Sequence, residues 1–263
     1  MIRIATWNVN SVRARLPILL DWLREAAPDV LLLQEIKCEA DGFPFLEMES
    51  LGFRAAVAGQ RTYNGVAVLS RHPLRVLRDR LPGDETDEQA RYLEVETSGL
   101  RVASLYVPNG NPVGTDKFAY KLGWLERLKV HVAGLLEEEV PLVLGADWNV
   151  APEDRDVHDP IVWANDALCR QESRAAYRRL LHLGLIDAFR VLHPEAGRHS
   201  WWDYRAGAFA RDEGLRIDHL LLSPQAADRL ETAGIDRRPR ALEKASDHTP
   251  VWCVLRDESN SGL

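Results

Sequence analysis

The sequence of 263 residues has few cysteines, no long apolar run and no excess of positive charge. Cys38, Cys169 and Cys253 are widely spaced and form no CxxC pair, which indicates reduced thiols rather than a disulfide or zinc framework. No apolar stretch approaches the roughly 18 residues of a membrane-spanning helix. Residues 2–7 read as a strand and lack the pattern of a secretory signal. We therefore expect a cytoplasmic protein.

The formal net charge of −7 argues weakly against a nucleic-acid partner, because phosphate contacts need Lys and Arg. The charges are unevenly spread, however. Acidic residues gather at 84–88 and 137–139, whereas basic residues gather at Arg13 and Arg15 and within 237–244. Such a chain can present one positive face, although each run also fits an ordinary solvated surface. Net charge alone therefore decides nothing about the partner.

Repeats, low-complexity segments and Gly/Ser-rich linkers are also lacking, which favours one domain over 1–257 with a frayed tail at 258–263. Segments 71–90 and 150–171 show no clear periodicity and are expected to be long loops. Runs rich in Val, Ile and Leu predict strands at 2–7, 30–33, 65–69, 92–96, 101–106, 142–144, 216–222 and 251–255. Helical spacing predicts helices between Pro17 and Pro28, from about Thr115 to Leu135, and over 173–183. Layers of α/β structure with partly antiparallel sheets are expected.

Polar side chains recur at the ends of these apolar runs. They are Asn8, Glu35, Tyr106, Asp147, Asn149, Asp218, Asp247 and His248. Strands from distant parts of the chain can meet at one end of a sheet, so we expect these groups to converge there. Asp147 and Asn149 are two residues apart, and in extended chain their side chains face the same way.

Carboxylate and amide oxygens of this kind suit Mg²⁺ or Mn²⁺. Phosphodiester hydrolysis needs a metal to offset charge, a base for the attacking water, and donors for the charge that develops on the phosphoryl group. Each residue also has an ordinary structural explanation, since an Asp or Asn after a strand usually forms a turn or caps a helix. Only their joint occurrence favours a catalytic site.

Six short blocks contain most of these residues, in one order along nearly the whole chain. They read TWNVNSVRAR at 6–15, LLQEIK at 32–37, YVPNG at 106–110, DWN at 147–149, GLRID at 214–218 and SDHTPVW at 246–252. Together they resemble the exonuclease III family of apurinic/apyrimidinic (AP) endonucleases, in the endonuclease–exonuclease–phosphatase superfamily. The resemblance implies a four-layered α/β sandwich of two packed sheets flanked by helices, as in deoxyribonuclease I.

The same resemblance implies roles for the residues in these blocks. Glu35 would be the principal Mg²⁺ ligand, with Asn8 beside it, Asp247 as a further candidate, and Mn²⁺ as a substitute. Asp147, helped by Asn149, would orient or deprotonate the attacking water. His248, held by Asp218, would contact the scissile phosphate, and Tyr106 would bind the phosphate or stabilise the transition state. Whether His248 or Asp147 is the base, and whether one or two metals act, stays open.

The block SWWDYR at 200–205 resembles the family's pocket for a flipped abasic sugar, with Trp201 as its aromatic wall. An ordinary core tryptophan is the alternative there. Asn109 and Arg13 lie in matching blocks and are expected to contact DNA. One departure is Gly145-Ala146-Asp147, since the family usually has Gly directly before the catalytic aspartate. We expect the backbone to tolerate Ala146.

The resemblance implies a monomeric Mg²⁺-dependent AP endonuclease that incises 5′ to abasic sites. It also implies 3′→5′ exonuclease, 3′-phosphatase and 3′-repair diesterase activity on duplex DNA with abasic sites or blocked 3′ ends. Arg174, Arg178 and Arg179, or the basic residues of 237–244, are candidates for gripping the backbone. The alternatives are a sibling phosphoesterase, such as an inositol-phosphate phosphatase or a sphingomyelinase, and a non-catalytic DNA-binding scaffold.

Overall fold

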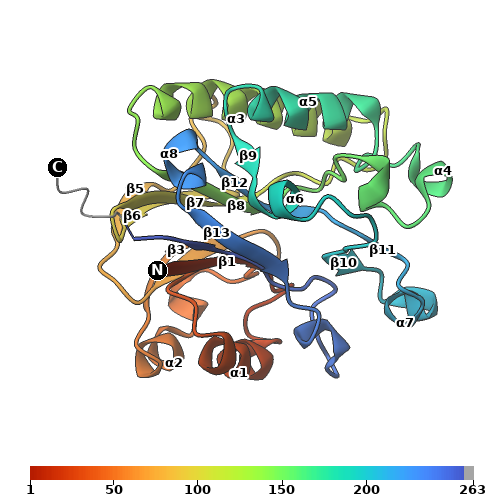
Figure 1. Cartoon of the computed structure of the whole chain (residues 1–263). Helices are drawn as coiled ribbons and strands as arrows, with labels where there is room; N and C mark the ends of the chain where they lie inside the picture. The colour runs from red at the N-terminus through yellow and green to blue at the C-terminus, as the bar shows by residue number, and fades with distance from the viewer. Residues whose placement is uncertain (258–263) are drawn as a thin grey trace.

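The computed structural model describes residues 1–257, in which two six-stranded sheets pack face to face between layers of helices (Figure 1). Helices α1 (Leu16–Ala26) and α2 (Phe45–Ser50) cover the outer face of one sheet. Helices α3 (Asp116–Leu136) and α5 (Gln171–Leu181) cover the outer face of the other. The predicted four-layered sandwich is therefore confirmed. The predicted tail at 258–263 lies outside the described residues.

Both sheets are mixed, and each contains one parallel pair of strands at its centre. In the first sheet β1 and β2 are parallel, and in the second β7 and β8 are parallel. The first sheet has the order β13 (Leu230–Ile235), β14 (Val251–Leu255), β1 (Ile2–Asn8), β2 (Val30–Gln34), β4 (Val66–Ser70), β3 (Arg54–Ala58). The second has the order β5 (Arg75–Arg78), β6 (Tyr92–Thr97), β7 (Leu100–Tyr106), β8 (Leu142–Asp147), β12 (Asp218–Leu222), β9 (Ile186–Asp187). The expectation of partly antiparallel sheets is confirmed.

Short elements fill the connections between the sheets. A two-stranded ribbon pairs β10 (Trp201–Trp202) with β11 (Gly214–Leu215). The short helices are α4 (Pro160–Trp163), α6 (Ala188–Leu192), α7 (Ala208–Arg211) and α8 (Pro224–Ala227). Single 3₁₀ turns lie at η1 (Ala40–Gly42), η2 (Asp154–Asp156), η3 (Arg205–Gly207) and η4 (Pro239–Ala241).

Three of the predicted segment assignments need correction. Segment 150–171 is not entirely loop, because η2 and α4 lie within it. Segment 71–90 is not entirely loop, because β5 lies within it at the exposed edge of the second sheet. The predicted strand at 216–222 begins only at Asp218, because Gly214 and Leu215 pair with the ribbon strand β10 instead. No helix within residues 1–257 is long and apolar enough to cross a membrane.

The alternation of side chains along β8 explains how the core leads into a polar site. Val143 packs in the core between the sheets, whereas Leu144 and Ala146 pack in the core beneath α3 and α5. A Cβ on Gly145 would meet Leu32 of the opposite sheet, so position 145 faces the same way as Val143. Residue 147 continues this inward face.

At that end of the sandwich the core between the sheets becomes polar. Gln34 Nε2 donates to Thr6 Oγ1 at 3.0 Å and to Ser104 Oγ at 3.0 Å, and all three side chains are fully buried. These hydrogen bonds satisfy groups that would otherwise be costly to bury. The polar cluster therefore forms the floor beneath the residues that end the neighbouring strands.

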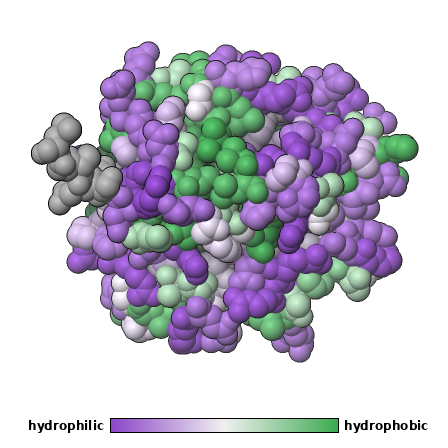
Figure 2. Space-filling view, viewed as in Figure 1, coloured by the Kyte–Doolittle hydropathy of each residue, from purple (hydrophilic) through white to green (hydrophobic). Residues whose placement is uncertain are grey.

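The outer surface is mainly hydrophilic on the face that Figure 2 shows, with one hydrophobic area near its centre. A smaller hydrophobic group projects at the edge where Figure 1 places α4 (Figure 2). That helix carries Ile161 and Val162, whose side chains are strongly exposed.

Candidate active site

The predicted site residues converge where strands of both sheets end. Asn8 is the last residue of β1, and Glu35 directly follows β2. Tyr106 ends β7, Asp147 ends β8, and Asp218 begins the antiparallel strand β12. Tyr106 pairs with Asp147, and Asp147 pairs with Asp218, in adjacent strands. The expectation that these groups meet at one end of the sheets is confirmed.

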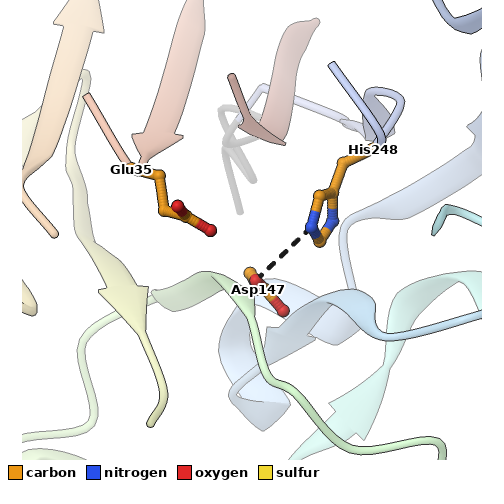
Figure 3. Close-up of side chains that lie close together, drawn as sticks. All are labelled: Glu35, Asp147 and His248. Atoms are coloured by element: carbon orange, nitrogen blue, oxygen red, sulfur yellow. Dashed lines mark ion pairs between the residues drawn. The ribbon is translucent and has the colours of Figure 1, made fainter. Parts of the chain in front are cut away.

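Three ionisable side chains approach one another closely at this point. Glu35, Asp147 and His248 each offer a ligand atom, and these atoms all lie within 4.8 Å of one another (Figure 3). Nε2 of His248 lies 3.7 Å from Oδ2 of Asp147. The amide of Asn8 joins the two carboxylates, because its Nδ2 donates to Glu35 at 2.7 Å and to Asp147 at 2.9 Å.

The donor set fits a divalent cation that prefers oxygen. Glu35 and Asp147 bring two carboxylates to one point, and carboxylate oxygens are ligands that such cations prefer. Burial opposes ionisation of Glu35, but the charge of Lys37 at 2.9 Å and the Asn8 amide outweigh it and lower its pKa. Glu35 is therefore an anion at neutral pH.

The other two predicted metal ligands make different contacts. The side-chain oxygen of Asn8 accepts the backbone N–H of Asn10 at 3.0 Å, so its amide nitrogen faces the carboxylates. Asp247 accepts hydrogen bonds from Trp201 Nε1 and from Asn10 Nδ2, both at 3.0 Å, and it does not belong to the Glu35 cluster. Metal ligation by Asn8 and Asp247 stays a prediction.

His248 is held by a buried carboxylate, as predicted from its sequence block. Nδ1 of His248 lies 2.9 Å from Oδ2 of Asp218, and Ser200 donates to that same oxygen at 2.7 Å. Burial alone would lower the pKa of His248, but the charges of Asp218 and Asp147 outweigh it and raise the pKa. The imidazole therefore carries a positive charge next to the carboxylate cluster.

Asp147 and Asn149 contact each other, but not in the extended conformation that their spacing suggested. The strand ends at Asp147, and Asn149 has a left-handed backbone with φ of 48°. The Asn149 N–H donates to Asp147 Oδ1 at 3.0 Å, and its Nδ2 donates to Oδ2 at 3.2 Å. Burial raises the pKa of Asp147 above its usual value, against the charge of His248.

Ala146 is accommodated without displacing these groups. It lies in the extended strand β8 and packs in the core beneath the helices, where a methyl group adds buried apolar contact. The position that requires glycine is 145, where a Cβ would lie 2.4 Å from Leu32 Cδ1. Ala146 is therefore tolerated because it faces the helices, whereas residue 145 faces the opposite sheet.

Tyr106 contributes a hydroxyl group that stays protonated. Burial, together with the charges of Glu35 and Asp147, raises its pKa well above the usual value. The guanidinium of Arg91 lies 4.7 Å from the centre of the Tyr106 ring and fixes the ring from one side.

A pocket of about 290 Å³ opens directly above the cluster. Its polar side includes the cluster itself together with Tyr106 and Asn109. Its apolar wall consists of Trp163, Leu168, Trp201 and Ile217. Trp201 and Trp163 meet edge to face, with ring centres 5.8 Å apart.

Among the residues predicted to contact DNA, Trp201 and Asn109 line the pocket, but Arg13 does not. Arg13 instead donates from Nε to the Gly42 carbonyl at 2.8 Å on the exposed surface. Trp202, the neighbour of Trp201, is fully buried and donates to Asp212.

Sequence reasoning missed several residues of the site. Asp166 lines the pocket and accepts from Asn111 Nδ2 at 3.1 Å, but both lie in loops without a periodic signal. Lys121 is fully buried on α3 beneath the pocket. It follows Phe118 and precedes Trp124 at helical spacing, and a charged residue on that apolar stripe was a visible signal.

Comparisons with known proteins give relatives that match over almost the whole chain. The model of the Endonuclease/Exonuclease/phosphatase family matches residues 5–248. An exodeoxyribonuclease III from Haemophilus influenzae is 35% identical, covering 97% of this chain and 100% of that protein. Two solved structures are also similar. The 3′ phosphatase NExo from Neisseria, bound to a product DNA hairpin, has a TM-score of 0.95 and 39% identity, covering 97% and 100% of the two chains. An AP endonuclease from Archaeoglobus fulgidus has a TM-score of 0.93 and 37% identity, covering 97% and 99%.

Proposed function

Because this chain belongs to the Endonuclease/Exonuclease/phosphatase family, and within it to the exonuclease III family of AP endonucleases, we propose that it repairs DNA with one metal-dependent phosphodiesterase site. It is a nuclease, and its substrate is duplex DNA. We propose Mg²⁺ as the metal, with Mn²⁺ as a substitute. We also propose incision 5′ to abasic sites, and release of blocking groups and nucleotides from 3′ ends.

One observation carries this proposal more than any other. Glu35 from one sheet, Asp147 from the other, and His248 meet within 4.8 Å at the floor of a pocket with a tryptophan wall. Two carboxylates would repel an anionic phosphate, and a bound metal would offset that repulsion. A DNA-binding scaffold without catalysis would have no use for buried carboxylates facing the phosphate.

A bound divalent cation supplies charge that offsets the phosphate oxygens and the leaving oxygen. Glu35, ionised at neutral pH, would hold it. Asp147 is hydrogen-bonded by Asn8 and Asn149, so its remaining lone pairs are aimed, and it would orient the attacking water and accept its proton. The His248 cation and the neutral Tyr106 hydroxyl would donate to the phosphoryl oxygens.

The pocket above the cluster supports a small, partly apolar sugar residue as its occupant. An abasic deoxyribose has no base to stack and leaves the duplex at low cost. Trp163, Leu168 and Trp201 would pack against its apolar side, while the scissile phosphate stays on the polar side. Action as a monomer and a location in the cytoplasm belong to the same proposal.

The test uses one duplex with a single abasic analogue and one duplex with a recessed 3′-phosphate. With Mg²⁺ we expect incision 5′ to the analogue and release of phosphate, and neither with EDTA. Glu35→Gln should lower kcat by about 10²-fold or more and raise the Mg²⁺ concentration needed for half-maximal activity. The matched control is Glu49→Gln on the surface of α2, which should leave both unchanged.

Separate outcomes distinguish the parts of this proposal. Loss of 5′ incision with retained 3′-phosphatase activity would contradict the AP-endonuclease part alone. Activity on inositol phosphates, without activity on either DNA duplex, would favour a sibling phosphoesterase. Full activity in EDTA would contradict the role of the metal.

A further inference from the structure

We propose that Lys121 is a positioning residue of the phosphate site, which fixes the loops that carry Asn109 and Asn149 relative to Asp147. The inference rests on the proposed function and deepens it, because it concerns how the same pocket keeps its geometry. Lys121 itself does not line the pocket.

The ammonium group of Lys121 joins three separate loops from behind. It donates to the backbone carbonyls of Asn109 at 3.0 Å, of Asn149 at 2.6 Å and of Ala167 at 3.3 Å. Those residues are far apart in sequence. The pairing of Tyr106 with Asp147 in β7 and β8 brings the first two close, and the Ala167 N–H donates to Asn111 Oδ1 at 3.1 Å. Lys121 adds one side chain that contacts all three carbonyls and so ties the three loops together.

Each of the three carbonyls belongs to a segment that faces the pocket. Asn109 and Asn149 line it themselves, and Asn109 Nδ2 donates to Asn149 Oδ1 at 3.0 Å. Ala167 is flanked by Asp166 and Leu168, which also line the pocket. Displacement of these carbonyls would therefore move the Asn149 amide, which holds Asp147, and the Asn109 amide, which holds Asn149.

Lys121 is a costly residue to bury, because burial disfavours its charged form, so its presence here needs compensating contacts. Among residues 1–257, no carboxylate lies within 4.0 Å of its nitrogen, so backbone carbonyls are its hydrogen-bond partners. Burial lowers the pKa of Lys121 to about 7. An apolar side chain at this position would avoid that penalty but would remove the Lys121 donor from the Asn109 and Asn149 carbonyls.

The neighbouring loop is shaped around this side chain. Gly110 has a left-handed backbone with φ of 86°, and a Cβ there would lie 2.6 Å from Cδ of Lys121. The loop thus closes directly over the lysine stem. Ser173 reinforces the third contact, because its hydroxyl donates to the Ala167 carbonyl at 2.6 Å.

Lys121→Met tests the proposal, because it removes the ammonium and keeps a linear side chain. On the 3′-phosphate duplex we expect kcat to fall about 10- to 100-fold, the effect of a misplacement of about one ångström. KM should change by less than about threefold, because the binding surface is retained. The matched control is Val132→Ala, which truncates a buried residue of the same helix away from the pocket. It should lower the melting temperature and leave kcat unchanged.

A double-mutant cycle distinguishes positioning from a general loss of structure. If Lys121 acts through Asn149, its loss should have little effect once the Asn149 amide is gone. In the Asn149→Ala background we therefore expect Lys121→Met to lower kcat by less than about threefold. Fully multiplicative losses would overturn the proposal. An equal loss of kcat in Val132→Ala would overturn it as well.

Side-chain amide signals of Asn149 in NMR spectra give a readout that needs no catalysis. Asn149 Nδ2 donates to the Val107 carbonyl at 2.9 Å, so its signals report the position of this loop. We expect them to shift in Lys121→Met and not in Val132→Ala. If the wild-type protein cleaves neither duplex, the proposed function fails, whereas unshifted Asn149 signals would refute the role of Lys121.

Discussion

At the residue scale, Asp218 determines the charge of His248, and Ser200 in turn holds Asp218. Ser200 Oγ donates to Asp218 Oδ2 and accepts the backbone N–H groups of Ile217 and Asp218, both at 3.1 Å. This short chain of hydrogen bonds reaches His248 from the protein interior. Ser200 and Asp218, which do not line the pocket, therefore influence the charge of His248, which does.

We expect Asp218→Asn to lower the pKa of His248. Burial favours the neutral imidazole, and the Asp218 charge is the largest influence that opposes it, so the proton should leave at lower pH. If protonated His248 is the active form, kcat should begin to decline at a lower pH in Asp218→Asn than in the wild type. Titration of the His248 ring signals by NMR measures the shift. Ser200→Ala should give a smaller shift in the same direction, and an unchanged pKa in both variants would contradict this account.

Site residues were predictable from the residues alone where they stand at the end of a strand, whereas Trp201 and Asn109 were predicted from the motifs that they share with the family. Asn8, Glu35 and Asp147 stand at the ends of apolar runs, and the period of a strand fixes which face they share. Asn149 was assigned to the right place for a wrong reason, because its left-handed backbone has no signature in sequence spacing. Asp166 gave no signal, since a loop has no period from which a direction can be inferred.

At the element scale, the strands predicted from sequence are those that have a hydrogen-bonded neighbour on both sides. β2 and β4 are buried at every residue and read as continuous apolar runs. The edge strands β3, β5, β9 and β13 were not predicted. In β5, for example, three of four residues are exposed, so selection for apolar side chains is weak and the run resembles a loop.

We expect Gly145→Ala to destabilise the contact between the sheets. A Cβ at this position would lie 2.4 Å from Leu32 Cδ1 and 3.1 Å from Thr6 Cβ, both in the opposite sheet. Such overpacking costs about 1–3 kcal/mol in the free energy of unfolding, which urea denaturation measures. Ala146→Gly, one residue along but facing the helices, should cost about 0.5–1 kcal/mol. A smaller loss in Gly145→Ala than in Ala146→Gly would contradict the inward direction of residue 145.

At the scale of the whole molecule, one buried cation links segments that are far apart in the sequence. Arg216 Nε donates to Asp156 Oδ1 at 2.7 Å, and its NH1 donates to Asp187 Oδ2 at 2.7 Å. Asp187 Oδ2 also lies 3.1 Å from Nδ1 of His219. The network joins the 3₁₀ turn η2, the edge strand β9 and the start of β12, so its charge state affects the entire end of the sandwich.

We expect Asp187→Asn to lower the free energy of unfolding by about 3–5 kcal/mol at pH 7, because a buried cation loses a partner. Burial alone would raise the pKa of Asp187, but Arg216 and His219 outweigh it and hold the pKa well below its usual range. Its stabilising contribution is therefore complete above the unfolded pKa of about 3.9 and is lost as the pH falls below it. Urea denaturation at pH 7 and pH 3 should show the gap between variant and wild type narrowing. A gap of constant size would refute this linkage.

The net charge of −7 is compatible with DNA because the arginines near the site are held in defined positions. The guanidinium of Arg237 lies 5.0 Å from the Trp202 ring centre, and Arg240 lies 5.3 Å from that of Tyr204. Arg15 donates to the Tyr204 hydroxyl at 2.9 Å. Neighbouring side chains thus hold these three arginines in defined positions, and Arg237 also forms an ion pair with Asp212 at 3.0 Å.

Since Glu35 follows a strand of one sheet and Asp147 ends a strand of the other, the width of the gap between the two sheets sets the spacing of these proposed catalytic groups. A change that widens this gap by about one ångström should lower kcat strongly, although each sheet would keep its own hydrogen bonds. Packing in the apolar core between the two sheets therefore influences the activity of the enzyme from a distance.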